Sequence, residues 1–127
     1  MRAIDTNVVV RYLVNDDPVQ ERVARNIVRE GFLLTATVLV ETEWVLRAVY
    51  RWPRARIHAA LAALIDLPSA ASVPEGVAWA LERFALGADL ADMIHIVSST
   101  GADCFATFDL GVARAADNGP LPIETLA

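Results

Sequence analysis

Four acids lie far apart in the sequence, each next to apolar residues: Asp5, Glu41, Asp92 and Asp109. A charged side chain in apolar surroundings is costly unless a partner compensates its charge. If these acids converge, each raises the pKa of the next unless a cation lies between them. A ligand set made only of oxygen atoms suits Mg²⁺ or Mn²⁺ and disfavours a structural zinc site. Converging acids would therefore predict metal-assisted hydrolysis of a phosphodiester.

Some of these acids also have a simpler interpretation, as helix caps or turn residues. Asp89 lies three residues before Asp92 at the predicted start of a helix, where capping explains it as well as metal binding does. Asp109 precedes Gly111 and could form an Asx-type turn. For Asp92 and Asp5 we favour the functional interpretation.

Two glutamates lie close together in one predicted helix, and only one is expected to serve the site. Glu41 has Val38 and Val45 three and four residues away, which predicts a mostly apolar helix face around it. Glu43 is expected to face outward or to pair with Arg47 one helical turn later. The functional interpretation is therefore assigned to Glu41.

Short apolar segments alternate with amphipathic ones along the chain. The predicted strands cover residues 2–5, 32–35, 103–109 and 121–124, and the first two are expected to be buried. The predicted helices cover residues 8–14, 18–30, 37–49, 54–67, a segment after 74 that continues past 84, 90–99 and 111–116. Thr6 or Asn7 is expected to cap the first helix.

This alternation predicts an α/β fold with a short, mainly parallel central sheet and helices on both faces, which makes three layers. In such sheets ligands bind at the carboxyl ends of the strands. Two predicted strands end in an acid, the first at Asp5 and the third at Asp109. The fold therefore predicts that both carboxylates face the same crevice.

Composition limits the class of protein. The chain has 127 residues, 55% of them hydrophobic, and is expected to form a single domain over residues 1–127. No apolar segment is long enough for a membrane span, and the first residues do not form a signal peptide. One cysteine excludes an internal disulfide, so we expect a cytoplasmic protein. The net charge of −5 becomes balanced if Asp89 and the four acids gather around cations.

One segment combines four arginines with two aromatic residues: Arg47, Arg51, Arg54 and Arg56, with Tyr50 and Trp52 between them. Arginine binds phosphate and aromatic rings stack on unpaired bases, which favours RNA contact. Arginines near a helix C-terminus are also favoured by the helix dipole, and Trp52 could belong to the core. A protein partner could dock on the same segment, so these alternatives stay open.

Four segments, in order, resemble the motifs of PIN-domain proteins. They are residues 4–13, 38–46, 89–95 and 106–109, and they carry Asp5, Glu41, Asp92 and Asp109 respectively. The resemblance implies a PIN-like α/β/α fold and an Mg²⁺- or Mn²⁺-dependent endoribonuclease that leaves 5′-phosphate and 3′-hydroxyl ends. It also implies a VapC-type toxin that is inhibited by a cognate antitoxin and forms a homodimer.

In the family that the chain resembles, further residues shape the site. These would be Thr6, Asn7 and Thr107, with Asp89 beside Asp92. The sequence departs from many relatives after Asp109, where Leu110 and Gly111 replace a basic residue. Phosphate contact at this edge is therefore not predicted from the motif.

Two other functions remain compatible with parts of the sequence. A haloacid-dehalogenase-like phosphatase also begins with a strand that ends in Asp, but it requires a second Asp where this chain has Asn7, and the chain contains no Lys. A PIN-like module that binds RNA or protein without catalysis is the other alternative. Four mutually repelling carboxylates argue against it, because a purely structural domain gains nothing from them.

Overall fold

The computed structural model describes residues 1–127, which form two compact units, Met1–Pro74 and Glu75–Ala127. The first unit contains three strands and four helices: β1 (Arg2–Ala3), α1 (Thr6–Leu13), α2 (Pro18–Arg29), β2 (Phe32–Leu33), α3 (Ala36–Ala48), α4 (Arg54–Ile65) and β3 (Ala70–Ser72). The second contains three helices and two strands: α5 (Val77–Ala85), α6 (Leu90–Val97), β4 (Phe105–Thr107), α7 (Leu110–Ala115) and β5 (Ile123–Thr125).

The sheet of the first unit is parallel, with strand order β1-β2-β3. β1 is an edge strand and both of its residues are exposed, so the prediction of a buried first strand is wrong; burial begins at Ile4. β3 was not predicted, because its sequence Ala-Ala-Ser contains no β-branched or aromatic residue. It forms because the central strand β2 offers backbone groups that need partners.

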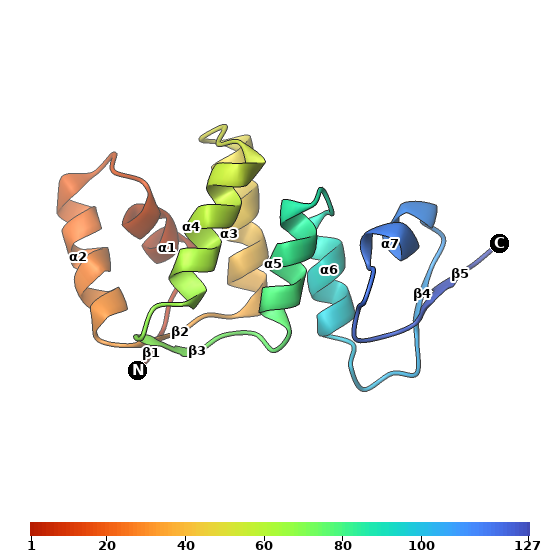
Figure 1. Cartoon of the computed structure of the whole chain (residues 1–127). Helices are drawn as coiled ribbons and strands as arrows, with labels where there is room; N and C mark the ends of the chain where they lie inside the picture. The colour runs from red at the N-terminus through yellow and green to blue at the C-terminus, as the bar shows by residue number, and fades with distance from the viewer. The chain divides into compact units, whose positions relative to one another are not determined.

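The helices of the first unit pack in a series, α2 on α1, α1 on α3, and α3 on α4 (Figure 1). Asp17 caps α2 by accepting from the backbone N–H of Gln20, and Pro18 occupies its first turn. The core of this unit consists of fully buried apolar side chains from the helices and the central strand: Val9, Phe32, Leu39, Leu46 and Leu61.

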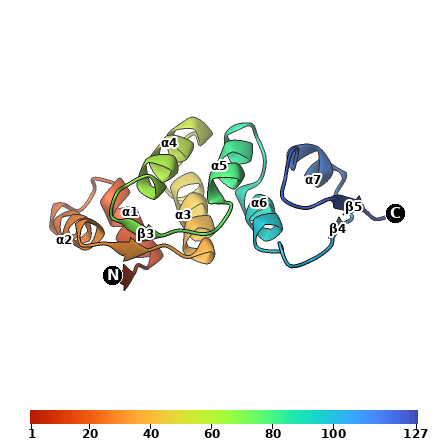
Figure 2. The same ribbon diagram turned by 60° about the horizontal axis from the view of Figure 1, so that its bottom comes forward.

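In the second unit α5 packs against α6, and β4 pairs with β5 in parallel (Figure 2). Gly76 precedes α5 with φ of +76°, and a Cβ at this position would lie 2.9 Å from the side chain of Val97. Only glycine permits this approach of α5 to the end of α6 without displacement. Each of the two helices buries large apolar side chains, Leu81 and Phe84 on α5 and Met93 and Ile96 on α6.

All seven predicted helices are present, with ends displaced by a few residues. α3 begins at Ala36 rather than residue 37, because Thr35 caps it by accepting from the backbone N–H of Val38. The four predicted strands are also present, divided between two sheets. None of the helices has the length and apolar character that a membrane crossing requires.

The buried face of α3 differs from the one predicted. Leu39, Thr42, Glu43 and Leu46 are buried, at the i, i+3, i+4, i+7 spacing of one helix face. Glu43 is only 5% exposed, so the prediction that it faces outward is wrong. Its predicted pairing with Arg47 is confirmed, since the Arg47 Nε donates to the Glu43 Oε2 at 2.8 Å. The carboxylate tolerates burial because this cation compensates its charge.

We expect Arg47→Met to lower the free energy of unfolding by about 1–3 kcal/mol, because it leaves a buried carboxylate without its paired cation. Chemical denaturation in urea measures this loss. The additional change Glu43→Gln should recover part of it. Arg25→Met removes a more exposed pair with Glu21 at the same spacing and should cost much less. Equal losses at the two arginines would contradict the structural role assigned to Glu43.

Candidate active site

In the first unit, Asp5 lies two residues after β1 and is the N-cap of α1. Its Oδ1 accepts from the backbone N–H of Thr6 at 2.8 Å. The prediction that Thr6 or Asn7 caps this helix is therefore wrong: the backbone is still extended at Asp5 and already helical at Thr6. The cap holds an exposed carboxylate at the positive end of a helix.

Thr6 connects Asp5 to the second predicted acid. Its side chain is 5% exposed, and its Oγ1 donates to the Oε1 of Glu41 on α3. Glu41 itself is exposed. The apolar face predicted around it is therefore not the buried face of α3, which runs through residues 39, 42, 43 and 46. The result is a solvent-accessible carboxylate whose orientation is set by a buried hydroxyl.

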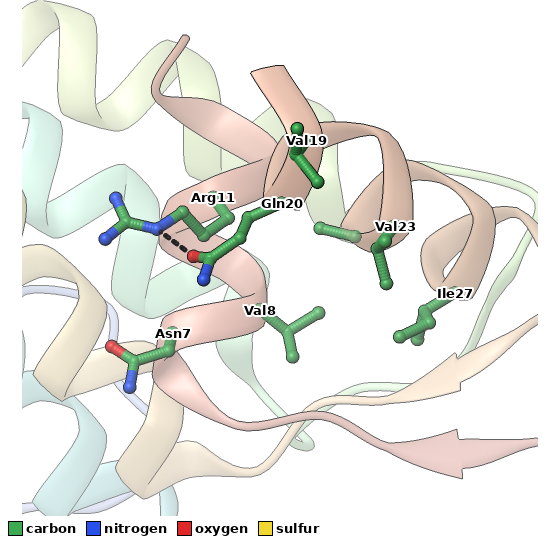
Figure 3. Close-up of a pocket in the computed structure, with 8 residues that line it drawn as sticks. Asn7, Val8, Arg11, Val19, Gln20, Val23 and Ile27 are labelled. Carbon is green, nitrogen blue, oxygen red and sulfur yellow. Dashed lines mark hydrogen bonds between the residues drawn. The ribbon is translucent and has the colours of Figure 1, made fainter. Parts of the chain in front are cut away.

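Asn7, predicted to support the site, lies at the edge of a largely apolar groove between α1 and α2 (Figure 3). The groove is lined by Asn7, Val8, Arg11, Val19, Gln20, Val23, Ala24 and Ile27. Within it the Arg11 Nε donates to the Gln20 Oε1 at 2.7 Å, as the dashed line in Figure 3 marks. No acidic side chain lines the groove, so neither Asp5 nor Glu41 belongs to it.

In the second unit, two aspartates cap consecutive helices. The Asp89 Oδ1 accepts from the backbone N–H of Asp92 at 3.0 Å and caps α6, which confirms the capping interpretation for Asp89. The Asp109 Oδ1 accepts from the backbone N–H of Gly111 at 2.8 Å, which confirms the Asx-type turn. Thr107 contacts the same turn, where its Oγ1 accepts from the backbone N–H of Asp109 at 3.0 Å.

Asp92 lies in the first turn of α6 and is half-buried. Burial raises its pKa above the ordinary value of 3.8, and the negative charge of Asp89 raises it further. His95 lowers the pKa in part, and the charge of Asp109 adds to the increase. Asp92 is therefore close enough to Asp89 and Asp109 to be repelled by both charges, and a bound cation would relieve this repulsion.

The donors available in the two units fit a hard divalent cation. Each capping aspartate uses only Oδ1 for its helix, so its Oδ2 is available to a ligand. All these donors are carboxylate oxygens, the ligand type that Mg²⁺ and Mn²⁺ prefer. Within neither unit do three or more Asp, Glu, His or Cys side chains form a group that could hold a metal ion. The meeting of Asp5 and Glu41 with Asp92 and Asp109 at one metal stays a prediction.

The arginine-rich segment, predicted to contact RNA or an antitoxin, contains four side chains in different settings: Arg47, Arg51, Arg54 and Arg56. The first is paired with Glu43 and so has a structural role. Arg56 lies over the ring of Trp52, 3.8 Å from its centroid, and Arg51 adopts the left-handed conformation between α3 and α4. Contact of this segment with RNA or a partner stays a prediction.

The PIN domain family matches residues 3–118, which span most of the chain and both units. The chain therefore belongs to the PIN domain family, whose members are generally nucleases. This membership confirms the predicted PIN-like α/β/α fold class and leaves the phosphatase alternative without support. No curated protein and no solved structure matches the chain.

We compare the free energy of unfolding of the metal-free protein with that of its Asp92→Asn variant. The unmodified protein should become less stable relative to the variant as the pH rises through the raised pKa of Asp92. The folded state binds the proton of Asp92 more tightly than the unfolded state, so losing that proton destabilises the fold. The Asn variant should be slightly more stable than the unmodified chain above that pKa, because Asp92 is only partly buried, and this gain should disappear below 3.8. Melting curves from pH 3 to pH 8 with a chelator present measure it. A gain that is larger in acid would contradict the origin given for the shift.

Proposed function

We propose that this chain is a divalent-metal-dependent endoribonuclease that hydrolyses RNA phosphodiester bonds. The observation that carries the proposal is that aspartates following the strands are exposed N-caps with one carboxylate oxygen to spare. A chain that needed Asp5 and Asp109 only as caps would be served equally by Ser, Thr or Asn. Membership of a family whose members are generally nucleases also supports this proposal.

In this proposal Asp5, Glu41, Asp92 and Asp109 hold Mg²⁺ or Mn²⁺. When bound, the ion supplies positive charge that activates a water molecule and stabilises charge at the phosphate. Thr6 orients Glu41 through its buried hydroxyl, and Thr107 holds the turn that presents Asp109. Asp89 secures the first turn of α6, so that Asp92 stays at the positive end of the helix.

We further propose that the nuclease is the toxin of a toxin–antitoxin pair, of the VapC type. This part rests on the order of the four acid-bearing motifs in the sequence. Its implied partners are an RNA substrate, a cognate antitoxin protein and a second copy of the chain, in the cytoplasm. Expression of the chain in bacteria should stop growth, and the product of an adjoining short reading frame should restore it. Growth arrest that persists with Asp5→Asn would contradict a toxin that acts through this site.

RNA cleavage by the purified chain should require Mg²⁺ or Mn²⁺ and stop with a chelator. Asp5→Asn and Asp92→Asn should each lower kcat/KM by about a hundredfold or more, because they remove an anionic ligand. The matched control is Asp17→Asn, which alters the carboxylate that caps α2 in the same way but outside the proposed site. Its activity should equal that of the unmodified chain.

Cleavage that survives both the chelator and Asp5→Asn would contradict this mechanism. The alternative, a PIN-like module that binds RNA or protein without catalysis, predicts that the chain needs no metal ion. If the chain neither binds Mg²⁺ or Mn²⁺ nor melts at a higher temperature with them, a binding module explains it better.

Removing the hydroxyl of Thr6 should weaken metal binding by about 10- to 100-fold, because Glu41 loses the group that orients it. Thr6→Val keeps the shape of this buried side chain, and Thr6→Ser keeps the hydroxyl and serves as the control. Calorimetric titration with Mn²⁺ measures the affinity directly. Equal affinities for the Val and Ser variants would show that Glu41 binds independently of Thr6 or not at all.

A further inference from the structure

A hollow of about 310 Å³ in the second unit lies between the end of α5 and α7. It is lined by Arg83, Leu86, Gly87, Ala88, Gly111, Arg114 and Ala115. Two of its walls adjoin predicted site residues. Ala88 directly precedes Asp89, and the backbone N–H of Gly111 is the donor that Asp109 accepts from.

Arg83 and Arg114 are the only basic side chains, apart from His95, among residues 75–127. The same stretch contains eight acidic residues: Glu75, Glu82, Asp89, Asp92, Asp103, Asp109, Asp117 and Glu124. Both arginines nevertheless line one hollow, 31 positions apart in the sequence. Concentrating the positive charge of an acidic unit at one place creates a local site for an anion.

The two guanidinium groups are held differently, and neither forms an ion pair with a carboxylate within this unit. The Arg83 Nε donates to the backbone carbonyl of Ala115 at 2.6 Å, which ties the end of α5 to the end of α7. This bond uses one of the five N–H donors and leaves the terminal nitrogens for a ligand. Arg114, on α7, is exposed and lines the same hollow.

We propose that this hollow binds a backbone phosphate of the RNA substrate that neighbours the phosphate being cleaved. The inference rests on the proposed ribonuclease function and adds where the chain holds its substrate. Arginine pairs with phosphate oxygens through two parallel N–H donors, and contacts of this kind position a nucleic acid without reading its sequence. The hollow also supplies positive charge near Asp109, where the motif itself lacks a basic residue.

The test measures binding of a single-stranded RNA oligonucleotide at several NaCl concentrations, in the Asp92→Asn background so that the RNA stays intact. Arg114→Gln and Arg83→Gln should each raise Kd by about three- to tenfold and reduce the slope of log K against log salt by about 0.7. The control is Arg29→Gln, an exposed arginine in the last turn of α2, which should change neither. If the salt slopes of both variants equal that of Arg29→Gln, the proposal is overturned. The hollow would then be a site for a carboxylate of a protein partner.

Arg114→Gln decides the outcome if Arg83→Gln fails to fold, because the Arg114 side chain donates no hydrogen bond that the unit depends on. With Asp92 restored, Arg114→Gln should raise KM and leave kcat within about twofold, since a neighbouring phosphate is bound equally before and during the reaction. Metal-dependent cleavage with an unchanged KM would overturn the phosphate site alone. Absence of cleavage in the unmodified chain would overturn the proposed function, whatever the salt slopes show.

Discussion

A hydrogen bond between an aspartate oxygen and a backbone N–H at a helix start determines where most of the predicted site residues lie. Asp5, Asp89 and Asp109 all form it, at the first turns of α1, α6 and α7. The bond satisfies an N–H that the helix itself leaves unpaired, and the helix dipole favours the negative charge. The interaction that starts each helix therefore also makes a concentration of carboxylates tolerable.

The same local design occurs in both units. Asp5 follows β1 by two residues and Asp109 follows β4 by two residues, and each then caps the next helix. A parallel strand delivers the chain to one edge of its sheet, and the helix turns it back from there. Thr6 and Thr107 reinforce the two junctions, one by orienting Glu41 and the other by accepting from the backbone of Asp109.

Elements whose signals are local could be predicted from the sequence. Pro18 and Gly31 bracket α2, and Asp89 precedes the apolar residues of α6. β3 could not be predicted, because the segment Ala-Ala-Ser becomes a strand only through pairing with β2, which lies far away in the sequence.

For the candidate site, too, local sequence signals could be predicted and features that depend on tertiary packing could not. The motif assigns Glu41 rather than Glu43 to the proposed site. The burial of Glu43 could not be predicted, because apolar residues surround both glutamates in the sequence. Which of them is buried depends on how α3 packs against α1 and α4. Arg83 and Arg114 gave one signal that was overlooked: they are the only arginines in the last 53 residues. That they share one hollow depends on tertiary structure.

The capping bond requires a single acceptor atom, and an asparagine amide supplies one as well as a carboxylate does. A chance mutation of Asp5 or Asp109 to Asn would thus erase the anionic charge while the helix still starts at the same residue. Chemistry and architecture can consequently be lost separately over evolutionary time. A lineage of this fold could decay into an inert binding protein by one nucleotide change, with little penalty in folding to oppose it.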